Sequence, residues 1–273
     1  MKLIARVGRI EDGCPDLETG SVDFSLFSPP YFKRDGYTPA LMRGVGKVLA
    51  RVMKPGARAY MVFGQILEDL DRPLEAQRLI LEGANGELAA GQTIIWVKSI
   101  AVGGWTESAH CPACSVEVDT HIPVLSRGHF QPISSPNLLN YCWEYVFSFV
   151  RTPVECAAKL NRIGIGVEFA DKSNLKRGTR GKNGDVHCPG DAWFVPHQTT
   201  GNTTKKTHRH EFPEELARRL IVLANPPASG MVCDLFLGGG TTALTAKKLG
   251  FNACGYDCNP DAVTALQKRW TGA

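Results

Sequence analysis

The chain has 273 residues, a formal net charge of +4 at pH 7 and 43 % hydrophobic residues, which is ordinary for a globular protein and enough for one large domain. No apolar run approaches the ~20 residues that cross a bilayer, and no charged and apolar leader opens the chain. Nine cysteines are an odd number and indicate reduced thiols rather than a disulfide framework, so we expect a cytoplasmic protein.

The N-terminal third predicts strands that alternate with helices. Apolar runs predict the strands, at residues 3–7, 22–27, 59–63 and 93–97. Helical spacing of apolar residues predicts helices at residues 38–53 and 68–82, the first of them closed by Lys54-Pro55-Gly56. This alternation predicts a mostly parallel sheet with helices on both faces.

The turn Ser28-Pro29-Pro30-Tyr31 follows the predicted strand at residues 22–27. The two prolines fix φ near about −65°, hold the preceding residue extended and lack a backbone N–H. The turn therefore offers carbonyl acceptors in fixed positions, with a hydroxyl before them and an aromatic ring after them. That arrangement suits an amino group on a flat ring, but a plain proline turn that closes a strand explains the same four residues equally well.

Two long segments, residues 99–140 and residues 152–210, lack a clear hydrophobic period, and a strand at residues 145–151 separates them. Loops of that length inside a compact domain are usually functional or disordered. The first segment holds Cys111, Cys114 and His121. A C-x-x-C pair is only half of a zinc site, and the spacing to the histidine is unlike that of common fingers, so we expect ordinary thiols and no metal.

The second of these segments is basic. From Arg151 to His210 there are eleven Lys or Arg residues against five Asp or Glu residues, which gives the stretch a charge of about +6 and leaves about −2 for the remainder. Its densest part holds five basic residues, Lys172, Lys176, Arg177, Arg180 and Lys182. The stretch is either a solvated loop or a surface that neutralises nucleic-acid phosphates.

The last quarter of the chain predicts a cofactor loop. A short strand that ends at Asp234 runs into a glycine turn and then into a helix. The pattern Gly238-x-Gly240-x-x-Ala243 fits a dinucleotide-binding turn, and Asp257 ends the next strand, where an acid commonly accepts hydrogen bonds from ribose hydroxyls. NAD and S-adenosylmethionine both carry a ribose, so this region alone leaves the cofactor open.

The order of the elements predicts a circular permutation. Helices are expected at residues 212–224 and 260–270, and the strand that ends at Asp257 is the last one in the chain. The sheet needs one more strand beside it, and the strand at residues 3–7 is the one that remains. We therefore expect the first strand of the chain to lie next to the last.

These residues together resemble the amino-group DNA methyltransferases of the permuted class often called beta. The resemblance rests on Ser28-Pro29-Pro30-Tyr31 preceding Asp234-x-Phe236-x-Gly238-x-Gly240-Thr241-Thr242. Six further stretches resemble the same family: Ile94-Ile95-Trp96-Val97-Lys98, Gly128-His129-Phe130-Gln131-Pro132-Ile133, Trp143-Glu144-Tyr145-Val146-Phe147, Ala170-Asp171-Lys172-Ser173-Asn174, Gly190-Asp191-Ala192-Trp193-Phe194-Val195-Pro196 and His210-Glu211-Phe212-Pro213-Glu214-Glu215-Leu216. The resemblance covers nearly the whole chain.

The resemblance implies an α/β fold of the Rossmann-like, S-adenosylmethionine-dependent methyltransferase type, circularly permuted, with an irregular basic DNA-recognition region. It implies in-line transfer of a methyl group from S-adenosyl-L-methionine to the exocyclic N4 of cytosine, or N6 of adenine, in a base flipped out of double-stranded DNA. A serine before the prolines is typical of N4-cytosine enzymes, so we expect cytosine, with adenine as the alternative. A DNA-binding module without catalysis, a nucleotide-dependent oxidoreductase, and methylation of RNA or protein are remoter alternatives.

The resemblance also implies roles for individual residues. The catalytic residues are Ser28, Pro29, Pro30 and Tyr31, with the Ser28 hydroxyl and the Pro29 carbonyl holding the amine and the Tyr31 ring stacking on the base. The cofactor-binding residues are Asp234, Phe236, Gly238, Gly239, Gly240, Thr241, Thr242, Asp257, Phe212 and Pro213, although Asp234 is also a candidate organiser of the loop. The DNA-binding residues are Lys172, Lys176, Arg177, Arg180, Lys182 and His129.

This interpretation divides the chain into five parts. Residues 1–98 and 211–273 form the catalytic and cofactor-binding halves of the methyltransferase domain, residues 99–140 a DNA-facing insertion, residues 141–151 a sheet strand, and residues 152–210 the target-recognition region. The expected partner is double-stranded DNA, with a cognate restriction endonuclease as a further candidate. The expected source is a bacterium or a phage.

Overall fold

The computed structural model describes eight stretches of the chain, residues 1–32, 35–66, 69–98, 109–110, 117–118, 141–168, 186–195 and 211–272. Nine residues with predicted roles lie outside these stretches: Lys172, Lys176, Arg177, Arg180, Lys182, His129, Cys111, Cys114 and His121. The predicted DNA contacts and the expected absence of a metal at the two cysteines therefore stay predictions.

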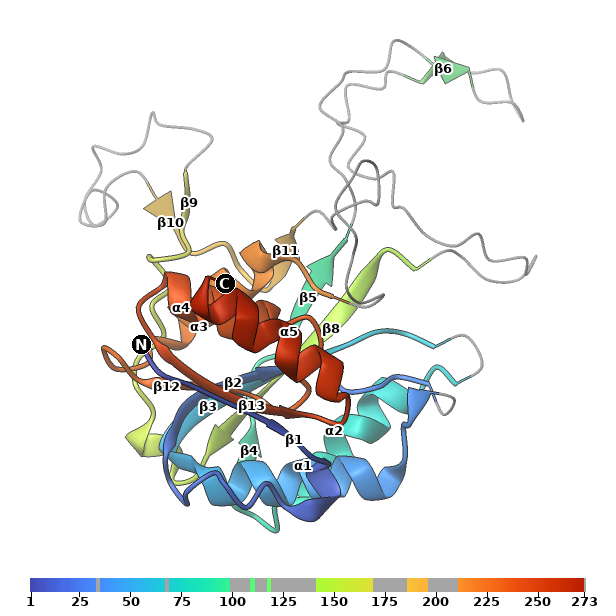
Figure 1. Cartoon of the computed structure of the whole chain (residues 1–273). Helices are drawn as coiled ribbons and strands as arrows, with labels where there is room; N and C mark the ends of the chain where they lie inside the picture. Colours follow the sequence, from blue (N-terminus) through green and yellow to red (C-terminus); the bar gives the residue numbers. More distant parts are fainter. Residues whose placement is uncertain are drawn as a thin grey trace.

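One large sheet forms the centre of the molecule (Figure 1). Its strands lie in the order β1 (Leu3–Val7), β13 (Asn252–Asp257), β12 (Met231–Asp234), β2 (Val22–Phe27), β3 (Met53–Phe63), β8 (Trp143–Arg151), β5 (Ile94–Val97) and β11 (Ala192–Phe194), with β4 (Leu88–Ala90) also paired to β8. Strand β8 runs antiparallel to β3, β4 and β5, and the other pairs are parallel. The predicted, mostly parallel sheet is confirmed.

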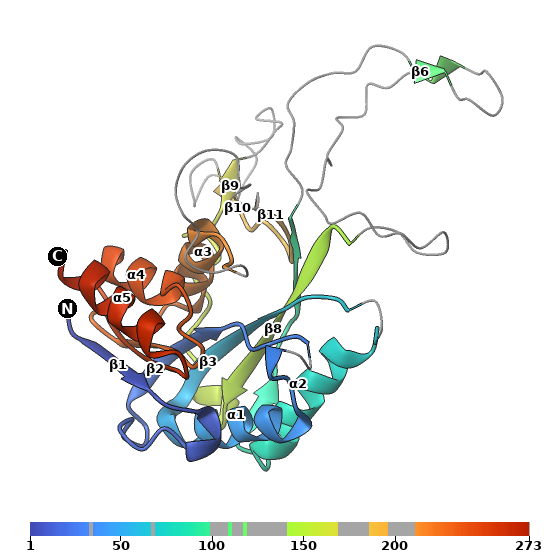
Figure 2. The ribbon, with the colours of Figure 1, turned by 45° about the vertical axis from the view of Figure 1, so that its right-hand side comes forward.

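Helices cover both faces of this sheet (Figures 1 and 2). One face carries α1 (Pro39–Val52) and α2 (Arg72–Gly83), and the other carries α3 (Glu214–Ala224), α4 (Thr241–Lys248) and α5 (Pro260–Thr271). Alternate residues of β3 enter the two cores, with Met61 and Phe63 on the α1 side and Tyr60 and Val62 on the α3 side. Within the described stretches, no helix is long and apolar enough to cross a membrane.

Short elements complete the part of the chain that can be described. They are two 3₁₀ turns at Ile10–Asp12 and Val154–Cys156, the pair β9 (Val167–Glu168) and β10 (Val186–His187), and the pair β6 (Ala109–His110) and β7 (Glu117–Val118).

The first strand of the chain pairs with the last, as the order of elements predicts. Strand β1 runs parallel to β13, with Leu3 opposite Ala253 and Val7 opposite Asp257. The two ends of the chain thus meet in one sheet, and the circularly permuted α/β fold is confirmed. The division of the chain at residues 98, 140, 151 and 210 stays a prediction.

Three local predictions were wrong. Lys54-Pro55-Gly56 does not end α1 as a turn but lies inside β3, because a register shift between Val22 and Phe24 on β2 accommodates the extra residues. Strands β4 and β11 were missed, since three residues are too short to show a period, and β11 lies inside the segment 152–210 that was predicted to be irregular. The helix predicted at residues 212–224 begins at Glu214, with Pro213 as its N-cap in an extended backbone.

Candidate active site

The proline turn and the glycine loop lie side by side at one edge of the sheet. Strands β2 and β12 are parallel neighbours, with Ser25 opposite Cys233, so the segments that follow them emerge at the same edge. Two buried hydroxyls tie the segments together. The Ser25 hydroxyl donates to the Cys233 carbonyl at 3.0 Å, and the Thr242 hydroxyl donates to the Leu26 carbonyl at 3.2 Å.

Carboxylates hold the main chain of the glycine loop. Asp234 Oδ1 accepts from the Phe236 N–H at 2.9 Å, and Asp257 Oδ2 accepts from the Gly238 N–H at 2.7 Å. Asp234 is 3 % exposed, and burial raises its pKa to about 7, against the opposing effect of the bond from Phe236. Asp234 therefore organises the loop from beneath, while Asp257 joins it to β13.

Gly240 begins α4 in a position that excludes other residues. Its φ is +81°, in the left-handed region, and a Cβ there would lie 2.5 Å from Cδ1 of Leu266 on α5. Any other residue here would strain the backbone and displace the Leu266 side chain.

Two cavities meet at the proline turn. The first, of 240 Å³, is lined by Ser28 and Pro30 from the turn and by residues around the glycine loop: Glu211, Phe212, Asp234, Phe236, Leu237, Gly238, Gly239, Thr241 and Asp257. The second, of 200 Å³, is lined by Ser28, Pro29, Pro30, Tyr31, Phe32 and Asp35. Because Ser28 and Pro30 line both cavities, a group bound in one can meet a group bound in the other at this turn.

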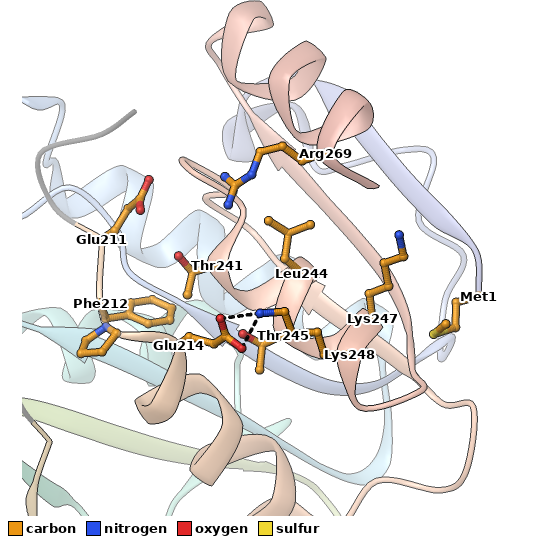
Figure 3. Close-up of a pocket in the computed structure, with 11 residues that line it drawn as sticks. Met1, Glu211, Phe212, Glu214, Thr241, Leu244, Thr245, Lys247, Lys248 and Arg269 are labelled. Carbon is orange, nitrogen blue, oxygen red and sulfur yellow. Dashed lines mark hydrogen bonds and ion pairs between the residues drawn. The ribbon is translucent and has the colours of Figure 1, made fainter. Parts of the chain in front are cut away.

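A third and larger cavity, of 630 Å³, lies beside the glycine loop, between the start of α3 and the helices α4 and α5 (Figure 3). Glu211, Phe212 and Thr241 line this cavity and the 240 Å³ cavity, so the two share a wall. Lys248 on its rim is paired with Glu214 at 2.7 Å. Glu211 Oε1 is buried, and no hydrogen-bond partner is found for it among the described residues.

Tyr31 turns its polar end into the protein. Its ring packs on Phe63 with centroids 4.7 Å apart, and its hydroxyl lies 2.8 Å from the Ser28 hydroxyl and 3.3 Å from Glu144 Oε2. Glu144 is ion-paired with Lys98. A Cβ on Gly64 would lie 2.8 Å from the Tyr31 ring and 3.1 Å from Glu144 Oε1, so glycine is what allows these two side chains to meet.

The model of the N6/N4 DNA methylase family matches residues 22–268, which include the turn, the glycine loop and both small cavities. The chain belongs to this DNA methylase family. The predicted membership of the amino-group DNA methyltransferases is thereby confirmed.

Curated relatives match parts of this chain. The type II methyltransferase M1.MboII of Moraxella bovis is 34 % identical over 120 residues, which are 42 % of this chain and 44 % of that protein. The type II methyltransferase M.ScaI of Streptomyces caespitosus is 34 % identical over 98 residues, which are 32 % of each chain. The matched stretches span less than half the length of either relative.

Solved structures resemble it over nearly its whole length. The PvuII DNA methyltransferase, described as cytosine-N4-specific, gives a TM-score of 0.65 at 14 % identity and covers 99 % of this chain and 86 % of that one. The complex of M1.HpyAVI with SAM gives a TM-score of 0.58 at 15 % identity and covers 98 % of each chain. At these identities the likeness concerns the fold, and it confirms the predicted Rossmann-like methyltransferase fold.

Most of the predicted catalytic and cofactor-binding residues line one of the two small cavities. Ser28, Pro29, Pro30 and Tyr31 line the 200 Å³ cavity, and Phe212, Asp234, Phe236, Gly238, Gly239, Thr241 and Asp257 line the 240 Å³ cavity. Gly240, Thr242 and Pro213 do not line it: Gly240 packs on α5, Thr242 is bonded to β2, and Pro213 caps α3 beside the larger cavity. The predicted roles of all these residues stay predictions.

Sequence reasoning assigned no role to Glu144, Lys98 or Glu211. Lys98 follows β5, and Glu144 lies on β8, so the two are brought together by strand pairing across 46 residues of sequence. All three residues lie in stretches that resemble the family, which was the only signal that pointed to them. In the described ranges, no group of three or more His, Cys, Asp or Glu residues could hold a metal ion.

Proposed function

We propose that the chain transfers a methyl group from S-adenosyl-L-methionine to the exocyclic N4 of a cytosine that is flipped out of double-stranded DNA. The observation that carries this proposal is the meeting of two cavities at Ser28 and Pro30. One cavity is bounded by the glycine loop and the other by the proline turn, which is the arrangement that a cofactor and an acceptor base require.

The 240 Å³ cavity fits this cofactor. Gly238 lines it with a φ of +47°, and the nearest atom to a Cβ there is 3.8 Å away, so the missing side chain leaves room for a ligand against the main chain. Asp257 offers acceptors for ribose hydroxyls, and the buried Oε1 of Glu211 is an unpaired acceptor that suits the cofactor's ammonium group. When bound, the cofactor supplies an activated methyl group.

The 200 Å³ cavity supplies the groups that an amine needs. The lone pair of an exocyclic amine is shared with its ring, and acceptors for both N–H groups help to localise it on the nitrogen. The Ser28 hydroxyl and the Pro29 carbonyl are these acceptors in our proposal, and neither Pro29 nor Pro30 has an N–H that competes for them. A base must leave the duplex to reach this cavity, at a cost of a few kcal/mol.

Cytosine is favoured over adenine as the substrate. A serine before the two prolines, as at Ser28, is typical of the N4-cytosine enzymes that the chain resembles. The PvuII methyltransferase, which is described as cytosine-N4-specific, shares the fold. N6-adenine methylation with the same residues is the alternative. The curated relatives are type II methyltransferases, which supports DNA as the partner and a cognate endonuclease as a further one.

Modification-sensitive sequencing of DNA from cells that express the chain, in a host without its own methylases, tests this proposal. We expect N4-methylcytosine at one sequence motif, and loss of that mark in Ser28→Ala. Ser21→Ala is the matched control, because the Ser21 hydroxyl donates to the Glu18 carbonyl at 2.7 Å in a loop away from the cavities. N6-methyladenine would establish the alternative, and DNA binding without any mark would indicate a module that lacks catalysis.

A further inference from the structure

Behind the proline turn, a hydrogen-bond relay, formed by Ser28, Tyr31 and Glu144, leads from the cavities into the protein. The Ser28 hydroxyl lies 2.8 Å from the Tyr31 hydroxyl, and either of them can be the donor. The Tyr31 hydroxyl lies 3.3 Å from Oε2 of Glu144, whose Oε1 is paired with the Lys98 ammonium. Glu144 is 8 % exposed. The relay therefore joins the proposed amine site to a buried carboxylate.

The carboxylate determines the direction of the hydrogen bonds in this relay. An ionised carboxylate only accepts, and the Tyr31 hydroxyl has one proton to give. The competing acceptor is the Val62 carbonyl, also at 3.3 Å, but a bond to a charged acceptor is roughly twice as strong as a bond to a neutral one. The phenol proton therefore goes to Glu144, and the Tyr31 oxygen accepts from Ser28. The lone pairs of Ser28 are then free for an amine.

Lys98 forms an ion pair with this carboxylate. The side chains of Lys98 and Glu144 are 20 % and 10 % exposed, so each shields the charge of the other from an environment that holds little water. Arg72, a second cation near the turn among the described residues, donates at 3.3 Å to the Tyr31 carbonyl and not to its phenol. Burial in the first place, and the charge of Glu144 in the second, raise the pKa of Tyr31 well above its usual value. Tyr31 is therefore a neutral link.

We propose that Glu144, held by Lys98, is a positioning residue. It makes the hydrogen bonds of the relay point from Ser28 through Tyr31 to Glu144, and this relay is the route by which the amine loses a proton. This inference rests on the proposed function, whose amine site contains Ser28. It assigns to Glu144 a role that the turn alone does not supply.

The proton balance of this route is complete. As the N–C bond forms and the S–C bond of the methyl donor breaks, the amine nitrogen becomes positively charged. An N–H bond then breaks and its electron pair returns to the nitrogen. The proton passes to Ser28 Oγ, the proton of Ser28 passes to Tyr31, and that of Tyr31 passes to Glu144, which ends as a neutral carboxylic acid. The last two transfers follow the hydrogen bonds from Ser28 to Tyr31 and from Tyr31 to Glu144.

The first test needs no activity. In protein labelled with ¹³C at the tyrosine Cζ atoms, Tyr31→Phe identifies the Tyr31 resonance, and Glu144→Gln is expected to move it upfield because the phenol loses its charged acceptor. Glu75→Gln is the matched control, since Tyr37 donates to Glu75 at 3.1 Å and only the Tyr37 resonance should move. An unchanged Tyr31 resonance in Glu144→Gln overturns the inference.

The second test is single-turnover methyl transfer. We expect Glu144→Gln to slow transfer by about 100-fold, the scale of a lost proton acceptor, with DNA and cofactor affinities within about twofold of the wild type. Because both residues act in one hydrogen-bond relay, the double variant Tyr31→Phe with Glu144→Gln should be no slower than the slower single variant. Multiplying effects, or wild-type transfer in Glu144→Gln, overturn the inference.

Two further outcomes separate the inference from the proposed function. If Glu144→Gln does not fold, Lys98→Met replaces it, because this variant keeps the carboxylate but frees it, and it must move the Tyr31 resonance and slow transfer. If the wild type methylates no DNA, the proposed function fails. The Tyr31 resonance still reports whether the Tyr31 hydroxyl donates to Glu144.

Discussion

The two halves of the site are built from different parts of the polypeptide. On the proposed cofactor side, the glycine loop lines the cavity, and the carboxylates of Asp234 and Asp257 hold its N–H groups at 2.9 and 2.7 Å. On the proposed base side, polar side chains support the turn, because the Ser28 and Tyr31 hydroxyls lie 2.8 Å apart and lead to Glu144.

This difference teaches which changes each half tolerates. A cavity lined by a glycine loop depends on the backbone conformation of that loop and on the carboxylates that hold it. A site made of hydroxyls and a carboxylate depends on single polar atoms and on the space in which they meet. Four substitutions test this contrast, and they are taken in order of decreasing effect.

Gly64→Ala should have the largest effect, and it should act on the base side alone. Its Cβ would lie 2.8 Å from the Tyr31 ring and 3.1 Å from Glu144 Oε1, so the two side chains must separate. We expect overpacking to cost about 1–3 kcal/mol of unfolding free energy and methyl transfer to fall by about 100-fold or more, with cofactor affinity unchanged in calorimetry.

Gly44→Ala is the control for that substitution. Gly44 lies in α1, and the nearest atom to its Cβ is Cγ2 of Ile10 at 3.9 Å, so alanine should be neutral or slightly stabilising. Normal transfer by Gly64→Ala would mean that the contact between Tyr31 and Glu144 is not needed.

Gly240→Ala should damage the cofactor side instead. Its φ of +81° and the Leu266 contact at 2.5 Å together predict a loss of about 2–3 kcal/mol of unfolding free energy and about tenfold weaker cofactor binding. Gly250→Ala is matched to it in backbone conformation, with a φ of +86°, but no atom lies within 4 Å of the added Cβ. If both variants lose the same stability in urea unfolding, the packing of the loop on α5 contributes nothing.

Asp234→Asn should change how stability depends on pH. The folded state raises the pKa of Asp234 from 3.8 to about 7, so this carboxyl binds a proton more readily when folded. Its contribution is full below pH 3.8, falls by at most about 1.4 kcal/mol per pH unit as the pH rises towards 7, and is level above that. We expect the asparagine variant to lack this slope in urea unfolding between about pH 4 and pH 7. An identical slope in both proteins would mean that Asp234 titrates normally.

Thr242→Val should have the smallest effect, and it tests the link between the two halves. The variant leaves the buried Leu26 carbonyl without the donor that lies at 3.2 Å, which should cost about 1 kcal/mol. Thr242→Ser keeps the hydroxyl and should retain most of the stability. If Thr242→Val instead weakens cofactor binding and leaves stability intact, Thr242 contacts the cofactor, as the resemblance implies.

Most of the fold could be predicted from the sequence, because it follows from local patterns. The strand that ends at Phe27 and the helix at Pro39–Val52 were readable from apolar runs and from the helical spacing of apolar residues. The permutation was readable as well, since the order of the elements left β1 as the strand beside β13. Lys54-Pro55-Gly56 misled because a bulge can absorb a Pro-Gly pair within a strand.

The proline turn and the glycine loop could be predicted as parts of one site, but what supports the turn could not. The ion pair of Lys98 with Glu144 depends on the antiparallel register of β5 and β8, in which Trp96 lies opposite Glu144, and nothing in the local sequence fixes that register. The Tyr31 hydroxyl is a further example, because the sequence shows the ring but not the direction in which its oxygen points.

The pairing of β1 with β13 has a consequence for how the protein is made. Within the described part of the chain, β13 is the only strand that pairs with β1, and about 250 residues separate Leu3 from its partner Ala253. A ribosome releases β1 long before it has synthesised β13, so β1 waits unpaired while the residues between them are translated and joins the sheet late. A strand that is synthesised before the rest of the sheet is thus among the last to pair, and the nascent chain exposes it for that whole interval.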